Sequence, residues 1–153
     1  MATRPRPRAS RAATAPRGRP FLNTNFSVDL GAGDSRSQSI GFSEVILPDL
    51  PVRKPDKTAV AAPDAPGQRL VLRRGFDGTA DLRSWWNDTR RSKAPKPRTV
   101  TVRLLAEDCA TVAATWTFAG ARPVSLGYSP LHASEPSVVI ETLALDSDDV
   151  ELR

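Results

Sequence analysis

Residues 99–118, TVTVRLLAEDCATVAATWTF, decide the expected fold. Apolar side chains largely alternate with polar ones through both halves of this stretch, at Val100, Val102, Leu104, Val112, Ala114, Trp116 and Phe118. A period of two is typical of strands that bury one face. Residues 107–110, EDCA, separate the halves and suit a hairpin turn. The stretch therefore predicts two antiparallel strands, at 99–105 and 111–118.

Shorter strands are predicted on either side of this hairpin. Alternating or short apolar runs lie at 25–30, 38–46 and 70–72, and again at 137–145, SVVIETLAL. After Gly120 we expect a loop, because Pro123, Gly127 and Pro130 punctuate the sequence. The acidic residues 146–151, DSDDVE, are interpreted as a tail that faces water or a basic neighbour. The fold is therefore expected to be mainly β, with about six antiparallel strands.

One helix is predicted, over residues 79–92, TADLRSWWNDTRRS. Leu82, Trp85 and Trp86 share one helical face. Asp77 or Thr79 is expected to cap the start of the helix. The tryptophan pair is compatible with a ligand platform, but we favour the interpretation that these three residues anchor the helix to the sheet.

The chain is expected to consist of one domain with an N-terminal tail. Its 153 residues are typical of a single domain. Residues 1–20 contain six arginines, several prolines and no acid, so we expect a disordered tail. Without these six, 16 basic residues face 17 acidic ones, so the domain 21–153 is nearly neutral. Residues 47–67 contain five prolines and predict a long loop, either a binding element or a mobile surface segment.

Charged residues in the domain are unevenly distributed along the sequence. Basic residues dominate 69–103 and only acidic ones occur at 135–151. Both groups can simply be solvated; the sharper hypothesis is that they form complementary surfaces on identical subunits. The candidate inter-subunit charges are Arg73, Arg74, Arg90, Arg91, Asp146, Asp148, Asp149 and Glu151.

The sequence gives little support for catalysis or for a cofactor. A metal site needs clustered ligands, and the chain has one cysteine, Cys109, and one histidine, His132. These two could pair as nucleophile and base only if the fold brought them together. No phosphate-binding glycine motif occurs. We therefore expect no enzyme, no cofactor and no metal. A nucleic-acid-binding module that uses the basic tail remains the alternative function.

Nothing in the sequence predicts a membrane span or a secretory signal. No apolar run approaches the roughly 20 residues of a transmembrane helix. The arginines near the N-terminus are not followed by an apolar run. The single cysteine excludes a disulfide within the chain and fits assembly in a reducing cytoplasm.

Several short motifs, taken together, resemble the tail-tube protein family of contractile phages and extracellular contractile injection systems. They occur in the family's order and cover most of residues 21–150: NFSV at 25–28, GFSEV at 41–45, LVLRRG at 70–75, DLRSWW at 81–86, VTVRLL at 100–105, WTFAGARPV at 116–124 and IETL at 140–143 within 135–145.

The resemblance implies a fold and a structural role. The implied fold has two packed antiparallel sheets, as a small β-barrel or sandwich, with one flanking helix. The implied assembly is a six-membered ring whose sheets join into an inner barrel, with rings stacked into a tube beside sheath, baseplate or spike subunits. Such a particle assembles in the cytoplasm and can be released. The segment 47–67 and the tail 1–20 differ from the family's pattern. Two roles therefore stay open, a repeating tube subunit and a tube-initiating paralog.

Overall fold

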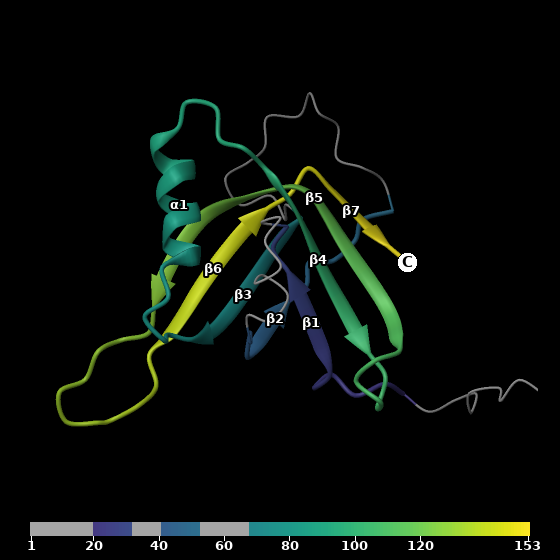
Figure 1. Ribbon diagram of the computed structural model, residues 1–153, viewed down its shortest axis with the longest axis horizontal. Coiled ribbons are helices and arrows are strands. Elements are labelled where there is room, and N and C mark those ends of the chain that lie inside the picture. The colour runs from purple at the N-terminus through teal and green to yellow at the C-terminus, as the bar shows by residue number, and fades with distance from the viewer. Residues whose placement is uncertain (1–19, 32–40, 53–67) are drawn as a thin grey trace, which may run out of the picture.

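The computed structural model describes residues 20–31, 41–52 and 68–153, which form seven strands and one helix (Figure 1). The predicted tail and most of the predicted loop 47–67 lie outside these residues. The helix is α1 (Asp81–Arg91). The strands are β1 (Phe26–Asp29), β2 (Glu44–Ile46), β3 (Arg69–Gly75), β4 (Arg98–Leu105), β5 (Val112–Tyr128), β6 (Ile140–Asp146) and β7 (Asp149–Leu152).

The strands form one antiparallel sheet that folds into two facing halves. The strand order is β1-β4-β5-β6-β3-β2, with β7 on the side of β5. The first part of β5 pairs with β4 and β7, and its second part pairs with β6. We call β1, β4, β7 and the first part of β5 the β4 half, and the remainder the β6 half. Among the described strands, β1 and β2 do not pair with each other, so the barrel is not closed. The predicted antiparallel, mainly β architecture with a flanking helix is confirmed, with β5 shared by both halves.

The loop predicted after Gly120 is wrong for residues 121–128, which continue β5 to its full length of 17 residues, whereas Pro130 does lie in a loop between β5 and β6. Gly120 has a φ of 65°, which a residue without a side chain adopts easily, and the strand bends there. Pro123 pairs in register with Leu145 next to a register shift. Proline is tolerated at a bulge and on a strand segment with one neighbour, and Pro123 has both conditions.

The segment 146–151 has the basic neighbours that were predicted, but it is not a tail, because Asp146 ends β6 and residues 149–151 belong to strand β7. Its residues pair with Trp116 to Ala119 of β5. Val150 lies opposite Phe118 and packs against the core, which explains why this acidic segment is ordered. β6 begins at Ile140, three residues later than predicted, whereas the turn between β4 and β5 lies where it was expected.

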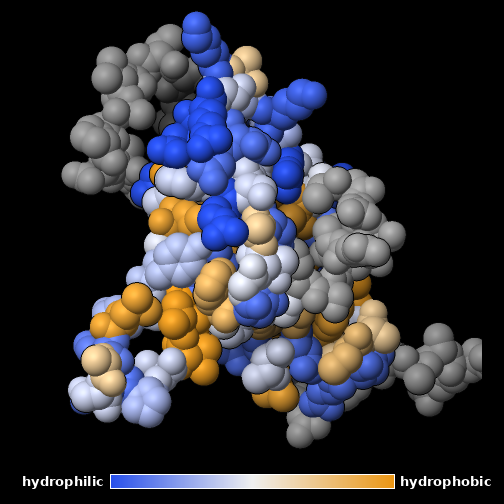
Figure 2. All heavy atoms as spheres, turned by 60° about the vertical axis from the view of Figure 1, so that its left-hand side comes forward, coloured by the Kyte–Doolittle hydropathy of each residue, from blue (hydrophilic) through white to orange (hydrophobic). Residues whose placement is uncertain are grey.

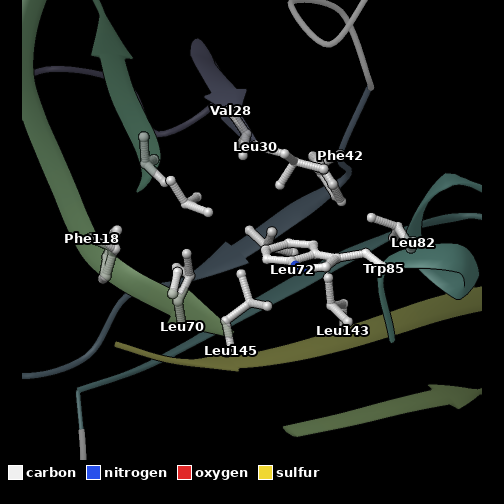
Figure 3. Packing of buried hydrophobic residues seen from close by; sticks show 13 residues of the cluster. Val28, Leu30, Phe42, Leu70, Leu72, Leu82, Trp85, Phe118, Leu143 and Leu145 are labelled. Atoms are coloured by element: carbon white, nitrogen blue, oxygen red, sulfur yellow. The ribbon is translucent and has the colours of Figure 1, made fainter. Parts of the chain in front are cut away.

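The core lies between the two halves and under the helix. Leu70, Leu72, Val100, Phe118, Leu143 and Leu145 are all 0% exposed. Figure 3 shows leucines of the β6 half facing Val28 and Leu30, with the Trp85 ring inserted beside them. Complete burial of each such side chain contributes about 1.5–3 kcal/mol.

The expected side-chain cap of α1 is absent from its first turn. The N-cap residue is Ala80, which makes no side-chain capping bond. Asp77 instead accepts hydrogen bonds from the N–H of Thr79, at 2.9 Å, and from its hydroxyl. Asp81 in the first turn and Arg90 and Arg91 in the last turn interact favourably with the helix dipole. The helix ends where the Ser92 N–H donates to the Asp88 carbonyl at 3.0 Å.

Candidate inter-subunit surfaces

The β6 half has a free strand edge on each side. β2 pairs with β3 on one side only, and β5 beyond Ala121 pairs with β6 only. Over the residues that the structure describes, the opposite sides of these segments have no strand partner. Unpaired N–H and C=O groups along such an edge can pair with a strand of another chain. The edges carry exposed apolar residues, Ile46 on β2 and Val124 on β5.

The outward face of the β6 half carries charges that compensate each other. Arg73 donates from Nη1 to Oε2 of Glu44 on β2 at 2.7 Å. Arg69 donates from Nε to Oδ1 of Asp146 on β6 at 2.8 Å. The hydrogen bond to Asp146 and its negative charge raise the pKa of Arg69. The other positions of this face include the small or polar residues Ser125, Gly127, Thr142 and Ala144 and the apolar residues Val71 and Ile46.

Arg74 does not belong to the predicted charged surface, because its side chain is buried. It donates from Nε to Oε2 of Glu141 at 2.9 Å and from Nη1 and Nη2 to Asp81 at the start of α1. Burial by itself would lower the pKa of Arg74, but the two carboxylates outweigh it and raise that pKa. Glu141 also accepts from the Tyr128 hydroxyl at 3.0 Å. Burial and this hydrogen bond raise the pKa of Tyr128. The cluster ties β3, β5, β6 and α1 together.

The predicted acidic set is mostly neutralised within its own chain. Asp146 pairs with Arg69. Asp148 lies 3.0 Å from Arg122, and Glu151 lies 3.1 Å from Arg153. Asp149 is the first residue of strand β7, and it too is not free of polar or electrostatic interactions. This set therefore differs from the free acidic surface that the sequence suggested.

The structure places the predicted helix residues in two environments. Leu82 is 1% and Trp85 3% exposed, and both belong to the core. Trp86 is half-buried outside the core cluster, with the Arg90 guanidinium 4.8 Å from its ring centroid. Arg90 also donates to Oδ1 of Asn87 at 3.3 Å. Arg91 is exposed at the end of the helix.

A pocket of about 460 Å³ lies beside the C-terminal end of α1. Its lining includes Trp85, Asp88, Lys96 and Arg98. The Arg98 guanidinium lies 4.4 Å from the centroid of the Trp85 ring. Burial lowers the pKa of Arg98, and the charges of Asp88 and Asp81 oppose this shift. Arg98 forms no hydrogen bond or ion pair from its side chain within the described part of the chain. Sequence reasoning counted Arg98 only as one basic residue among many.

No catalytic arrangement is seen in the described residues. Cys109 lies in the turn between β4 and β5, and His132 lies in the separate β5–β6 loop (Figure 1). Groups of three or more potential metal ligands are absent from residues 20–31, 41–52 and 68–153. In the same ranges, no helix has the length and apolar character needed to cross a membrane.

Solved structures with the same architecture come from contractile injection systems. A chain of the extended PVC sheath–tube complex superposes with a TM-score of 0.69 at 20% identity, covering 88% of this chain and 91% of the other. A chain of the PVC sheath/tube terminator gives 0.69 at 22%, covering 89% and 98%. A chain of the anti-feeding prophage tube-terminating cap gives 0.68 at 19%, covering 89% and 92%. At identities this low, the structural similarity establishes the fold alone. No curated protein matches the sequence.

This antiparallel fold, with an open sheet and one flanking helix, is the fold of those injection-system chains. Residues 22–151 match the model of the T4-like virus tail tube protein gp19, and the chain belongs to this family. It is a tail-tube-like structural protein, as the motifs between residues 25 and 145 indicated. The alternative of a nucleic-acid-binding module has no support from the family or the fold.

Proposed function

We propose that this chain forms a six-membered ring that builds or initiates the inner tube of a contractile injection system or phage-tail-like particle. One observation carries the proposal: in a member of the tail-tube family, the described residues leave both edges of the β6 half without a strand partner. The unpaired backbone groups of such an edge can pair with another chain, and a closed ring of identical copies can cover both of these edges.

The ring contact joins the β2 edge of one copy to the Arg122–Tyr128 edge of its neighbour. The two edges lie on opposite sides of the four-stranded β6 half, so the contact is heterologous, and the proposed ring requires its rotation to close after six copies. The outward face of this half then lines the lumen. Its exposed charged pairs, Arg69 with Asp146 and Arg73 with Glu44, suit a water-filled channel.

The proposed partners are copies of the chain and sheath, baseplate or spike subunits. Similar chains come from complexes described as sheath–tube, terminator, cap and baseplate, which supports this set. We propose assembly in the cytoplasm followed by incorporation into a particle that can be released. The segments 1–20 and 47–67 favour a role at the start of the tube, next to the baseplate.

Mass photometry and electron microscopy of the full-length protein test the ring. Val124→Lys places a charge on the β5 edge, so this variant is expected to stay monomeric where the wild type forms rings. Val112→Lys is the matched control. Val112 is 48% exposed and Val124 is 42% exposed, and both lie on β5, but Val112 lies in the β4 half. A wild-type protein that stays monomeric with its sheath and baseplate partners would contradict the proposal.

A further inference from the structure

The pocket beside α1 presents a guanidinium, that of Arg98, which forms no hydrogen bond or ion pair with a carboxylate of the described residues, although Asp88 lines the same pocket. Arg98 is half-buried and stacks on the buried Trp85 ring, so its position is fixed by packing. A guanidinium has five N–H donors, and side-chain acceptors for those of Arg98 are absent from the described residues. A prearranged donor group of this kind binds a carboxylate through two parallel hydrogen bonds.

The surroundings of the pocket favour an anion from outside the subunit. Two cations, Lys96 and Arg98, and one acid, Asp88, line the pocket. Arg91 and Lys93 are exposed on the adjoining end of the helix and the following loop. Within the described residues, neither of these two cations has an ion-pair partner. Figure 2 shows hydrophilic side chains gathered over this upper end of the molecule.

The opposite end of the molecule carries a protruding loop with one acid. Residues 129–139 join β5 to β6 and project from the lower end in Figure 1, whereas the α1–β4 connection lies at the upper end. Leu131 is 81% and Val138 69% exposed, although both are apolar. Glu135 is the acid of this loop, is exposed and has no ion pair among the described residues.

We infer that, when rings stack head to tail, Glu135 of one copy enters the Arg98 pocket of a copy in the next ring. The inference deepens the proposed function and rests on it. The loop and the pocket lie at opposite ends of the same side of the subunit, so stacking along one axis brings each loop toward a pocket. The occupant is a second copy because its loop offers an unpaired carboxylate, whereas the acids at 146, 148 and 151 are occupied by their own arginines. Burial of Leu131 in the same contact adds an apolar contribution.

Charge reversal in full-length protein tests the pair, with stacked rings counted by electron microscopy and sedimentation. Glu135→Lys is expected to lower ring-to-ring affinity by about tenfold or more, as loss of one member of a partly desolvated pair does. The change lies in an exposed loop, so the rings themselves should persist. Arg98→Glu should have the same effect, and the double variant E135K/R98E should recover most of the stacking. Arg83→Glu is the matched control, since Arg83 is exposed on α1 and does not line the pocket.

The outcomes separate the inference from the proposed function. Rings that stack equally well with Glu135→Lys, or that never stack although they form, would overturn the inference and leave the ring intact. Loss of stacking with Arg98→Glu but not with Glu135→Lys would assign the pocket to a different acidic subunit, and would also overturn the inference. Absence of rings in the wild type would instead overturn the proposed function.

Discussion

Arg74 and Glu141 form an ion pair inside the protein, with Nε 2.9 Å from Oε2 and exposures of 3% and 0%. The pair joins adjacent strands β3 and β6, and the second carboxylate on Arg74, from Asp81, extends it to the helix. Burial of these charged groups costs desolvation free energy, which their mutual attraction offsets. Removal of the arginine would leave the buried carboxylate without that compensation. This cluster therefore fixes the helix against the β6 half.

Replacing Arg74 with methionine should destabilise the domain severely. Removing one partner of a buried pair usually costs about 3–5 kcal/mol, because the remaining carboxylate, here that of Glu141, stays desolvated. Urea denaturation of the variant measures this loss. Arg73→Met is the control: its pair with Glu44 is exposed, and such pairs contribute about 0–1 kcal/mol. Equal losses for the two variants would contradict the assignment.

The two adjacent tryptophans should respond differently to truncation. Trp85→Ala removes a buried ring from the core and should cost about 3–5 kcal/mol. Trp86→Ala removes a half-buried ring outside the core cluster, so its loss should be clearly smaller. Thermal and urea denaturation compare the two. A larger loss at Trp86 would show that the helix packs through its other side.

Alanine at Gly120 should weaken the bend of β5. The φ of 65° costs a residue with a side chain about 1–2 kcal/mol. A Cβ atom at this position would also clash with the Asp148 carboxylate, which pairs with Arg122. Gly127→Ala is the control, since a Cβ there meets no atom within 4 Å. If both variants melt at the wild-type temperature, the bend does not depend on glycine.

The turn between β4 and β5 should contribute stability that depends on pH. Hydrogen bonds from the Thr111 hydroxyl and from the N–H groups of Ala110 and Thr111 lower the pKa of Asp108 from 3.8 to about 2. Because the folded-state pKa is lowered, this contribution is present above pH 3.8 and disappears as the pH falls toward 2. The Tm difference between wild type and Asp108→Asn should shrink over that range. A difference that is constant with pH would exclude the carboxylate as its source.

Much of the fold could be predicted because local patterns matched the final environment. The alternation around Val100 and Val102 and the helical face of Leu82 and Trp85 each identify one buried side, and the structure buries those sides. Arg74 was misassigned although it follows Leu70 and Leu72 in the same alternation, which places it inward. The charge of Arg74 suggests an exposed side chain, but the alternation along β3 decides its position.

The remaining errors depended on pairing between distant segments. β7 alternates Asp149 and Glu151 with Val150 and Leu152, but such a short acidic segment becomes a strand only because β5 lies beside it. The continuation of β5 past Gly120 likewise depends on β6. The Arg98 pocket requires the loop after α1 to return over Trp85, and local sequence gives no signal for that approach.

The pairing of β3 with β6 also determines when the protein can fold. Arg69 and Asp146 are neighbours in the sheet but 77 residues apart in the sequence. Contacts this distant are slow to form, and β3 has to wait for β6 to be synthesised. During that interval, the apolar face of the β2–β3 hairpin has no cover. We therefore expect a nascent chain to depend on chaperones until its last strands emerge, so that ring formation begins only with complete subunits.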